Sequence, residues 1–238
     1  MATFNIEAYL DSLPSNTKII NLFDKNLTYI PSLERFYQLK ELWCSYNQIT
    51  QLDNLPNSLE KLYCSYNKIT QLNNIPNTLQ ILDCSNNKII QLYNLPLTLE
   101  ILYCSNNQIT QLDNLPHSLE MIWCNNNQIT QLDNLSNTLQ KLNCNANQIT
   151  QLDNLPNTIQ KLNCYENPLP SFELEYWKGI SKFRKIYFTS KYGSRLERYY
   201  IKNIRNKRIN KDFLDILYSP DFKFYKRLLD PTIQKLFY

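Results

Sequence analysis

Apolar and polar positions repeat along this chain with a period of twenty residues, from Leu39 to about residue 170. In each unit, positions one, four, six, eleven, fourteen and seventeen are apolar, and position nine is asparagine. A short fixed period is typical of proteins in which each unit forms one coil and stacks on its neighbours. We expect positions three to seven to form a short strand, with four and six pointing inward and three, five and seven facing out.

Position six is cysteine in all seven units. A free cysteine behaves as a small, often buried apolar residue, so the column predicts packing inside the coils. Zinc sites usually need clustered C-x-x-C pairs, and we therefore expect no metal and no cofactor. Because neighbouring strands lie about 4.8 Å apart, the distance between adjacent thiols does not rule out a disulfide bridge, although seven cysteines cannot all pair. The column is Cys44, Cys64, Cys84, Cys104, Cys124, Cys144 and Cys164.

Asparagine at position nine predicts a second structural column. Its amide both donates and accepts, so stacked copies can satisfy backbone groups where each strand ends. The L-P-x-S/T segment that restarts most coils contains proline, which disfavours a long helix there. The column is Asn47, Asn67, Asn87, Asn107, Asn127, Asn147 and Asn167.

The unit L-x-x-L-x-C-x-x-N-x-I resembles the leucine-rich repeat pattern L-x-x-L-x-L-x-x-N-x-L, with cysteine in the third apolar slot. With a degenerate unit of roughly 22 residues before Leu39, the resemblance covers residues 17–170. It implies an α/β solenoid, a right-handed superhelix of about eight coils with short parallel strands on its concave face. Residues 1–16 would then form an N-terminal cap segment and residues 171–238 an α-helical C-terminal cap.

The repeats share sequence features with two subtypes of the family. The short unit with its L-P-x-S/T-L restart is similar to the leucine-rich repeats of bacterial effectors, which enteric pathogens secrete into host cells. The motif L-Y-C-S-x-N-Q-I-T-Q-L resembles even more closely the leucine-rich repeat proteins of giant, mimivirus-like DNA viruses of amoebae. This second resemblance implies a viral protein that engages a host protein, in the host cytoplasm.

Composition excludes several kinds of chemistry. Two glycines are too few for a Rossmann fingerprint or a P-loop. The single histidine, His117, has no repeating partner, and we assign it no role. Bacterial effectors of this type often carry a ubiquitin-ligase domain with a cysteine nucleophile after the repeats, whereas the last cysteine here is Cys164, inside them. We therefore expect no enzymatic activity.

We expect neither a targeting signal nor a membrane span. No apolar run approaches the ~20 residues that cross a bilayer, and the start, MATFNIEAYLDSLPSN, lacks the basic and then apolar order of a signal peptide. We expect an intracellular protein without a membrane span.

The outward positions three and five carry the candidate binding surface. They need not be apolar for a coil to pack, yet several are aromatic or aliphatic. An exposed apolar patch often marks a binding surface, and tryptophan and tyrosine are enriched at interface hot spots. The alternative is that these residues reflect only the codon bias of an A+T-rich genome. The candidate partner-binding residues are Trp43, Tyr63, Ile81, Ile101, Tyr103, Met121 and Trp123.

The C-terminal segment, residues 171–238, differs in charge from the repeats. It holds 16 lysines and arginines and 7 acidic residues, a net charge of +9, against −5 for residues 1–170. Apolar spacing predicts short helices at 175–189, 194–208, 211–218 and 221–229. One interpretation is a helical cap on the last coil. The alternative is nucleic-acid or acidic-surface binding through the basic run, with possible phosphate contacts from Lys202, Arg205, Lys207, Arg208 and Lys211.

Overall fold

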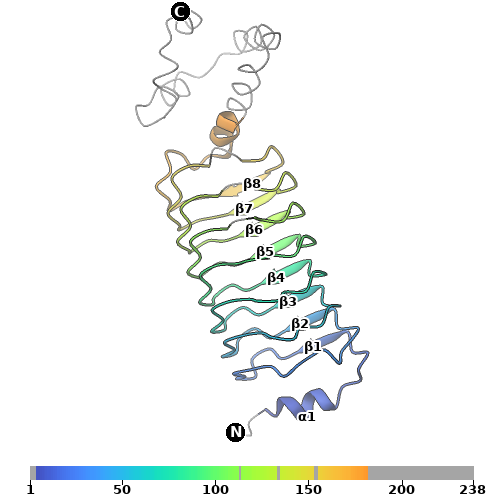
Figure 1. Ribbon diagram of the computed structural model, residues 1–238. Coiled ribbons are helices and arrows are strands. Elements are labelled where there is room, and N and C mark those ends of the chain that lie inside the picture. The colour runs from blue at the N-terminus through green and yellow to red at the C-terminus, as the bar shows by residue number, and fades with distance from the viewer. Residues whose placement is uncertain (1–3, 113, 133–134, 153–154, 182–238) are drawn as a thin grey trace, which may run out of the picture. The chain divides into compact units, whose positions relative to one another are not determined.

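The computed structural model describes residues 4–112, 114–132, 135–152 and 155–181, all within the compact unit Met1–Ser181. This unit is a stack of coils with one parallel sheet along its side, and the strands follow one another in chain order (Figure 1). The predicted solenoid of about eight coils is confirmed. Its elements are α1 (Ile6–Asp11), β1 (Ile19–Asn21), β2 (Glu41–Trp43), β3 (Lys61–Tyr63), β4 (Ile81–Asp83), β5 (Ile101–Tyr103), β6 (Met121–Trp123), β7 (Lys141–Asn143) and β8 (Lys161–Asn163).

The sheet is held in a register of equivalent positions. From β2 onward each residue pairs with the residue twenty positions later, as Leu42 does with Leu62. β1 pairs with β2 through Ile19 and Glu41, a step of 22 residues, so the degenerate first unit is a full coil. Equivalent residues of successive coils therefore lie side by side across the sheet. Figure 1 shows the strands that carry them stacked in chain order.

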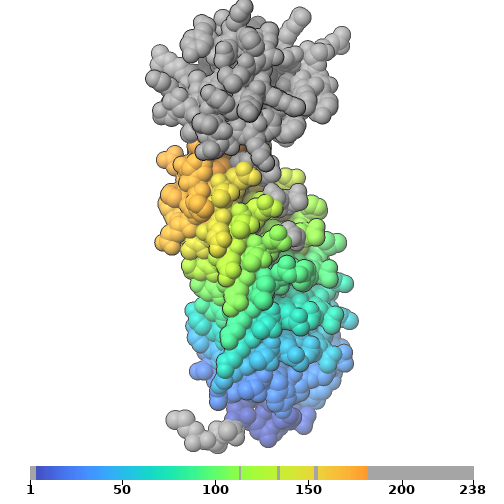
Figure 2. All heavy atoms as spheres, turned by 60° about the vertical axis from the view of Figure 1, so that its left-hand side comes forward, coloured from blue at the N-terminus to red at the C-terminus, as the bar shows by residue number. Residues whose placement is uncertain are grey.

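The core is a set of columns running through the stack. Side chains at positions one, four, six and eleven have no exposed surface in the third coil, where they are Leu59, Leu62, Cys64 and Ile69. The same positions are buried in the neighbouring coils. Their burial removes apolar surface from water at every step of the stack, and this is the main source of its stability. In Figure 2 the successive coils of this unit follow one another as coloured bands.

The strands are shorter than the sequence pattern predicts. They cover positions three to five and not three to seven. The amide of Cys44 at position six still donates to the Tyr63 carbonyl at 2.8 Å, but Tyr46 at position eight has a φ of 59°, which turns the chain away from the strand direction. Position seven was expected to face out, yet Ser45, Ser65 and Ser105 are buried.

A short helix lies before the first coil, and helical residues follow the last one. Asn5 caps α1 by accepting a hydrogen bond from the Ala8 amide at 2.9 Å, and Ile6 and Leu10 of this helix are buried. Arg35 donates to the Leu10 carbonyl and thereby ties α1 to the first coil. The first cap segment of the predicted organisation thus contains a short helix.

At the other end, residues 174–181 are helical, in agreement with the start of the helix expected at 175–189. Trp177 is buried, and its indole N–H donates to the Ser171 carbonyl at 2.9 Å. The Cys164 thiol of the last coil contacts the Phe172 carbonyl at 3.5 Å. The helices expected at 194–208, 211–218 and 221–229 lie outside the described residues. Among the helices that are described, none is long and apolar enough to cross a membrane.

Candidate functional site

The surface of interest is the strand face, defined as the side chains at positions three and five of β1 to β8. It contains all seven predicted partner-binding residues, which the register brings onto five neighbouring strands, β2 to β6. Figure 1 shows these strands side by side. The structure thus gathers on one surface residues that are up to 80 positions apart in the chain.

The aromatic residues of the strand face form two pairs. The rings of Trp43 and Tyr63 lie 4.3 Å apart, and those of Tyr103 and Trp123 lie 5.1 Å apart, edge to face. Trp43 is 38% exposed and Trp123 is 44% exposed, whereas both tyrosines are half-buried. Of these four aromatic residues, the two indoles are therefore the more accessible to a partner.

Aliphatic side chains fill position three beside these pairs. Ile81, Ile101 and Met121 are half-buried and follow one another on β4, β5 and β6. The Tyr103 hydroxyl lies 3.6 Å from the Met121 sulfur, which joins the aliphatic row to the second aromatic pair. Positions three and five of the central strands thus form one apolar area.

A further aromatic group lies just past the strand ends, at position eight. Tyr46 and Tyr66 stack with their rings 4.2 Å apart and 15° from parallel, and Phe23 lies 5.1 Å from Tyr46. These tyrosines are 47% and 46% exposed. Both have positive φ, a conformation that costs non-glycine residues energy. A side-chain hydrogen bond with Tyr66 raises the pKa of Tyr46 above that of a free phenol.

Charges on the strand face are unevenly compensated. Lys61 pairs with Glu41 at 2.7 Å, and this hydrogen bond lowers the pKa of Glu41 and raises that of Lys61. Asp83 lies between the two aromatic pairs, and none of the ion pairs among the described residues involves it. The sequence pattern placed Asp83 in the position-five column but did not single it out. The aromatic residues twenty positions before and after it, Tyr63 and Tyr103, are the sequence signal that could have identified it.

The seven thiols are buried and unpaired, as the packing interpretation predicted. The disulfide bridge that the strand spacing would allow between adjacent thiols is not formed. Burial raises the pKa of the Cys44 and Cys124 thiols to about 12, and that of the other five in the same direction. Thiols of this kind stay protonated at neutral pH and are poor nucleophiles and poor metal ligands. The described part of the chain has no group of three or more His, Cys, Asp or Glu that could hold a metal ion.

The asparagine column joins neighbouring coils, as predicted. The Asn127 side chain donates to the Cys104 and Cys124 carbonyls, both at 3.0 Å, and accepts from the Ile109 amide at 3.0 Å. The other asparagines at this position make equivalent bonds. A hydroxyl column at position twenty was missed: Thr98, for example, donates to the Leu79 carbonyl of the preceding coil at 2.8 Å. Its signal was the strict Ser or Thr at this position.

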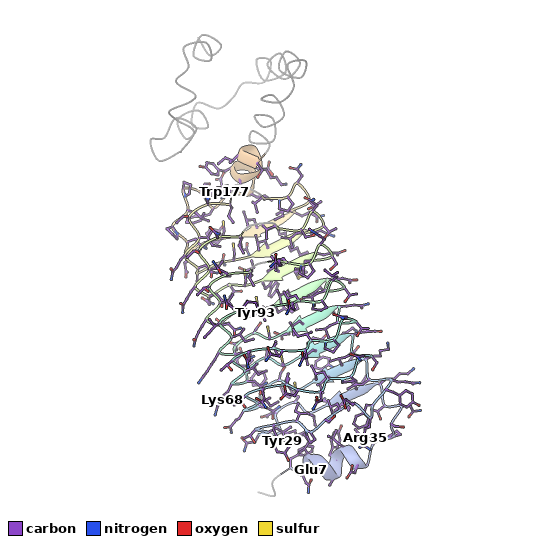
Figure 3. The ribbon with its side chains drawn as sticks, viewed as in Figure 1. Glu7, Tyr29, Arg35, Lys68, Tyr93 and Trp177 are labelled. Atoms are coloured by element: carbon purple, nitrogen blue, oxygen red, sulfur yellow. The ribbon has the colours of Figure 1, made fainter. Side chains whose placement is uncertain are left out.

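A second exposed surface was also missed, away from the strand face. The unit that contains β4 differs from the others at three exposed positions. It has Ile90 where the others mostly have threonine, Tyr93 where they have Asp or Asn, and Leu97 where they have Asn or His. Tyr93, labelled in Figure 3, lines a hollow of about 300 Å³. The other lining residues are Gln91, Leu92, Asn94, Leu95, Gln111 and Asn114. Departure from the repeat in a single unit was the available signal.

Two other sequence expectations concern His117, which was assigned no role, and the basic C-terminal run. The described structure assigns His117 no catalytic partner; its carbonyl accepts from the hydroxyls of Ser136 and Thr138. The possible phosphate-binding residues lie outside the described residues, so that expectation stays a prediction. They are Lys202, Arg205, Lys207, Arg208 and Lys211.

Two family models match parts of the repeat region. Residues 38–62 match the family described as Leucine Rich Repeat, and residues 98–137 match that described as Leucine Rich repeats (2 copies). No curated protein sequence gives a match.

Several solved structures are similar to the chain. A Shigella effector LRR domain shares 28% identity with a TM-score of 0.60, covering 74% of this chain and 80% of its own. YopM, a leucine-rich effector protein from Yersinia pestis, shares 31% identity with a TM-score of 0.59, covering 65% and 45%. InlJ from Listeria monocytogenes, whose functional domain includes a cysteine ladder, shares 29% identity with a TM-score of 0.51, covering 67% and 42%.

This chain aligns with less than half of the YopM and InlJ chains. The similarity therefore concerns the stacked repeats and not the whole of either protein. Both the repeat sequence and the parallel solenoid agree with the matched families. The sequence matches and the structural similarities thus agree that the repeat region of this chain is similar to leucine-rich repeat proteins.

Proposed function

We propose that this chain is a non-enzymatic protein-interaction module whose partner docks on the strand face. One observation carries the proposal: side chains that the coils do not need for packing are aromatic and aliphatic on five consecutive strands, β2 to β6. Leucine-rich repeat proteins typically bind protein partners, and solenoids use extended surfaces of this kind for binding. The energetic anchors are Trp43 and Trp123.

The physical basis is the water-exposed area that the two indoles keep in the free protein. Covering a tryptophan in an interface removes a large apolar area from water, and such residues are frequent hot spots. The tyrosines that contact each indole hold it in place, so little side-chain freedom is lost on binding. The strand face thus has preorganised anchors on a rigid sheet.

The proposal extends to a host protein as the partner. Its support is the resemblance of the repeats to leucine-rich repeat proteins of giant viruses of amoebae, together with the similarity to two bacterial effectors. The buried, protonated thiols of the cysteine column are consistent with a binding role and offer no nucleophile for catalysis.

The first experiment compares the wild-type chain with a Tyr103→Ala/Trp123→Ala variant in affinity capture from amoebal lysate. A partner of the strand face should be captured by the wild type and lost by the variant. The matched control is Tyr93→Ala, which removes an exposed aromatic ring outside the strand face and should leave capture unchanged.

The identified partner then allows a quantitative test. Trp123→Ala should weaken binding by about 1–3 kcal/mol, measured by calorimetry, because the indole is an exposed anchor. Circular dichroism and a thermal melt would show that the variant folds as the wild type does. Wild-type affinity in a folded Trp123→Ala variant would contradict the proposal.

A further inference from the structure

The position-five column of the strand face has a symmetric order across the five central strands. Trp43 and Tyr63 precede Asp83, and Tyr103 and Trp123 follow it, each on the next strand in register. A carboxylate thus occupies the centre of a row whose other four members are aromatic.

The Asp83 carboxylate is oriented but not neutralised. Its Oδ1 accepts a hydrogen bond from the Ser85 amide at 3.1 Å, and among the described residues no cation forms an ion pair with it. The nearby cation of the strand face, Lys61, is held by Glu41 at 2.7 Å. Asp83 is half-buried between its register neighbours Tyr63 and Tyr103, where a cation of a partner could form a charge-assisted hydrogen bond with the carboxylate.

The spacing of the row suits one cationic group. Adjacent strands lie about 4.8 Å apart, so Tyr63 and Tyr103 flank Asp83 at about 5 Å on either side. A cation bound by the carboxylate would therefore have an aromatic residue on either side, and an aromatic ring attracts a cation within roughly 6 Å of its centre. We propose that the strand face receives a cationic side chain, arginine or lysine, of the partner protein at Asp83, between Tyr63 and Tyr103.

This inference rests on the proposed function and adds the chemistry of the partner. Charges around the row favour the same occupant. The exposed carboxylates Glu100 and Glu120 directly precede β5 and β6. The strand-face lysines that form no ion pair with another described residue, Lys141 and Lys161, lie on β7 and β8. The centre of the surface therefore attracts a cation and repels a phosphate backbone.

The chain itself supplies a conservative variant for the test. Asn21 and Asn143 occupy the same position in β1 and β7, and their side chains accept the equivalent bond, from the Phe23 and Asn145 amides at 2.9 and 3.3 Å. Asp83→Asn should therefore keep the local turn and lose only the charge. An Asp83→Asn/Asn143→Asp variant restores the net charge three strands away and serves as the matched control.

The probe is a displayed library of random twelve-residue peptides, selected on the immobilised full chain. We expect the bound peptides to be enriched in arginine or lysine. Asp83→Asn should weaken these peptides about tenfold, and the double variant should not restore them. Replacing the cationic residue of the peptide by its neutral counterpart, citrulline or norleucine, should weaken binding to the wild type by a similar factor. The same replacement should cause little further loss of binding to the Asp83→Asn variant.

Trp43→Ala and Trp123→Ala separate this inference from the proposed function. Peptides that need the tryptophans but carry no cationic enrichment, or bind Asp83→Asn unchanged, overturn the inference and leave the docking surface intact. Peptides that need neither the tryptophans nor Asp83 count against both. Restoration by the double variant, or a library that yields no cationic binder, also overturns the inference.

Discussion

At the scale of single residues, asparagine does in this chain what glycine does in many others. Positions eight and sixteen of the coils require positive φ, and the chain has only two glycines. Asparagine tolerates this left-handed conformation better than other side chains with a Cβ. Most of these positions are asparagine, and the exceptions at position eight are Tyr46, Tyr66, Ala146 and Glu166.

These exceptions lead to a prediction about stability. Ala146, with a φ of 50°, should become more stable by about 1 kcal/mol as Ala146→Asn, since the left-handed cost is partly relieved. The reciprocal change at the same position of the preceding coil, Asn126→Ala, should destabilise by a similar amount. Urea unfolding measures both. Equal midpoints for all three proteins would contradict the explanation.

At the scale of elements, each coil is joined to the next by polar columns as well as by the apolar core. A three-residue strand makes few ladder bonds, so turns carry much of the backbone pairing. The position-nine amide satisfies carbonyls of two coils and one amide at once, in a place from which water is excluded. Losing such a group leaves buried partners without hydrogen bonds, which costs more than the bonds themselves contribute.

Asn127→Ala should therefore lower the free energy of unfolding by about 2–4 kcal/mol. The neighbouring Gln128→Ala, at an exposed side chain, should change it by less than about 0.5 kcal/mol. Denaturant unfolding measures the difference. Hydrogen exchange at the Ile109 amide, which Asn127 bonds, should accelerate in the first variant alone. Unaltered exchange there would refute the assigned role.

At the scale of the described unit, stability is a sum of nearest-neighbour contacts, because each strand pairs only with the one before and the one after. The ends of such a stack have one neighbour fewer and would expose apolar surface. Ile6 and Leu10 of α1 cover the first coil, and Trp177 packs in the segment that follows β8 (Figure 3). Opening is expected to start at an end whose cover is lost.

Trp177→Ala should destabilise the unit by about 3 kcal/mol, as loss of a buried aromatic ring does. The loss should be local, with faster hydrogen exchange in β7 and β8 and little change in β2 and β3. Leu10→Ala provides the mirror control, since it should loosen the opposite end. A uniform loss of protection along the stack would show that the unit opens as a whole.

Much of the fold could be predicted from the sequence. The twenty-residue period at Leu59, Leu62, Cys64 and Ile69 allows one way of burying all four in every coil, so coil number, strand order and the buried thiols followed from it. The length of the strands did not follow. It depends on the left-handed turn at position eight, where the sequence has tyrosine as well as asparagine.

The candidate surface was predicted in its members but not in its arrangement. Side-chain alternation suffices to place Trp43 and Trp123 on the outside of the sheet. It does not tell which aromatic rings touch or that Ser45 is buried. Nor does it tell that, among the described residues, Glu41 has an ionic partner and Asp83 has none. Those facts depend on the register between strands and on the side-chain directions that packing selects.

The sequence by itself determined the repeating coil and its buried columns, because the hydrophobic pattern is a local property that recurs in every unit. The tertiary structure alone decided which outward residues become neighbours, because Tyr63, Asp83 and Tyr103 meet only when three coils stack in register. Contacts between residues distant in the chain depend on that stacking, and the chemistry of the strand face arises from them.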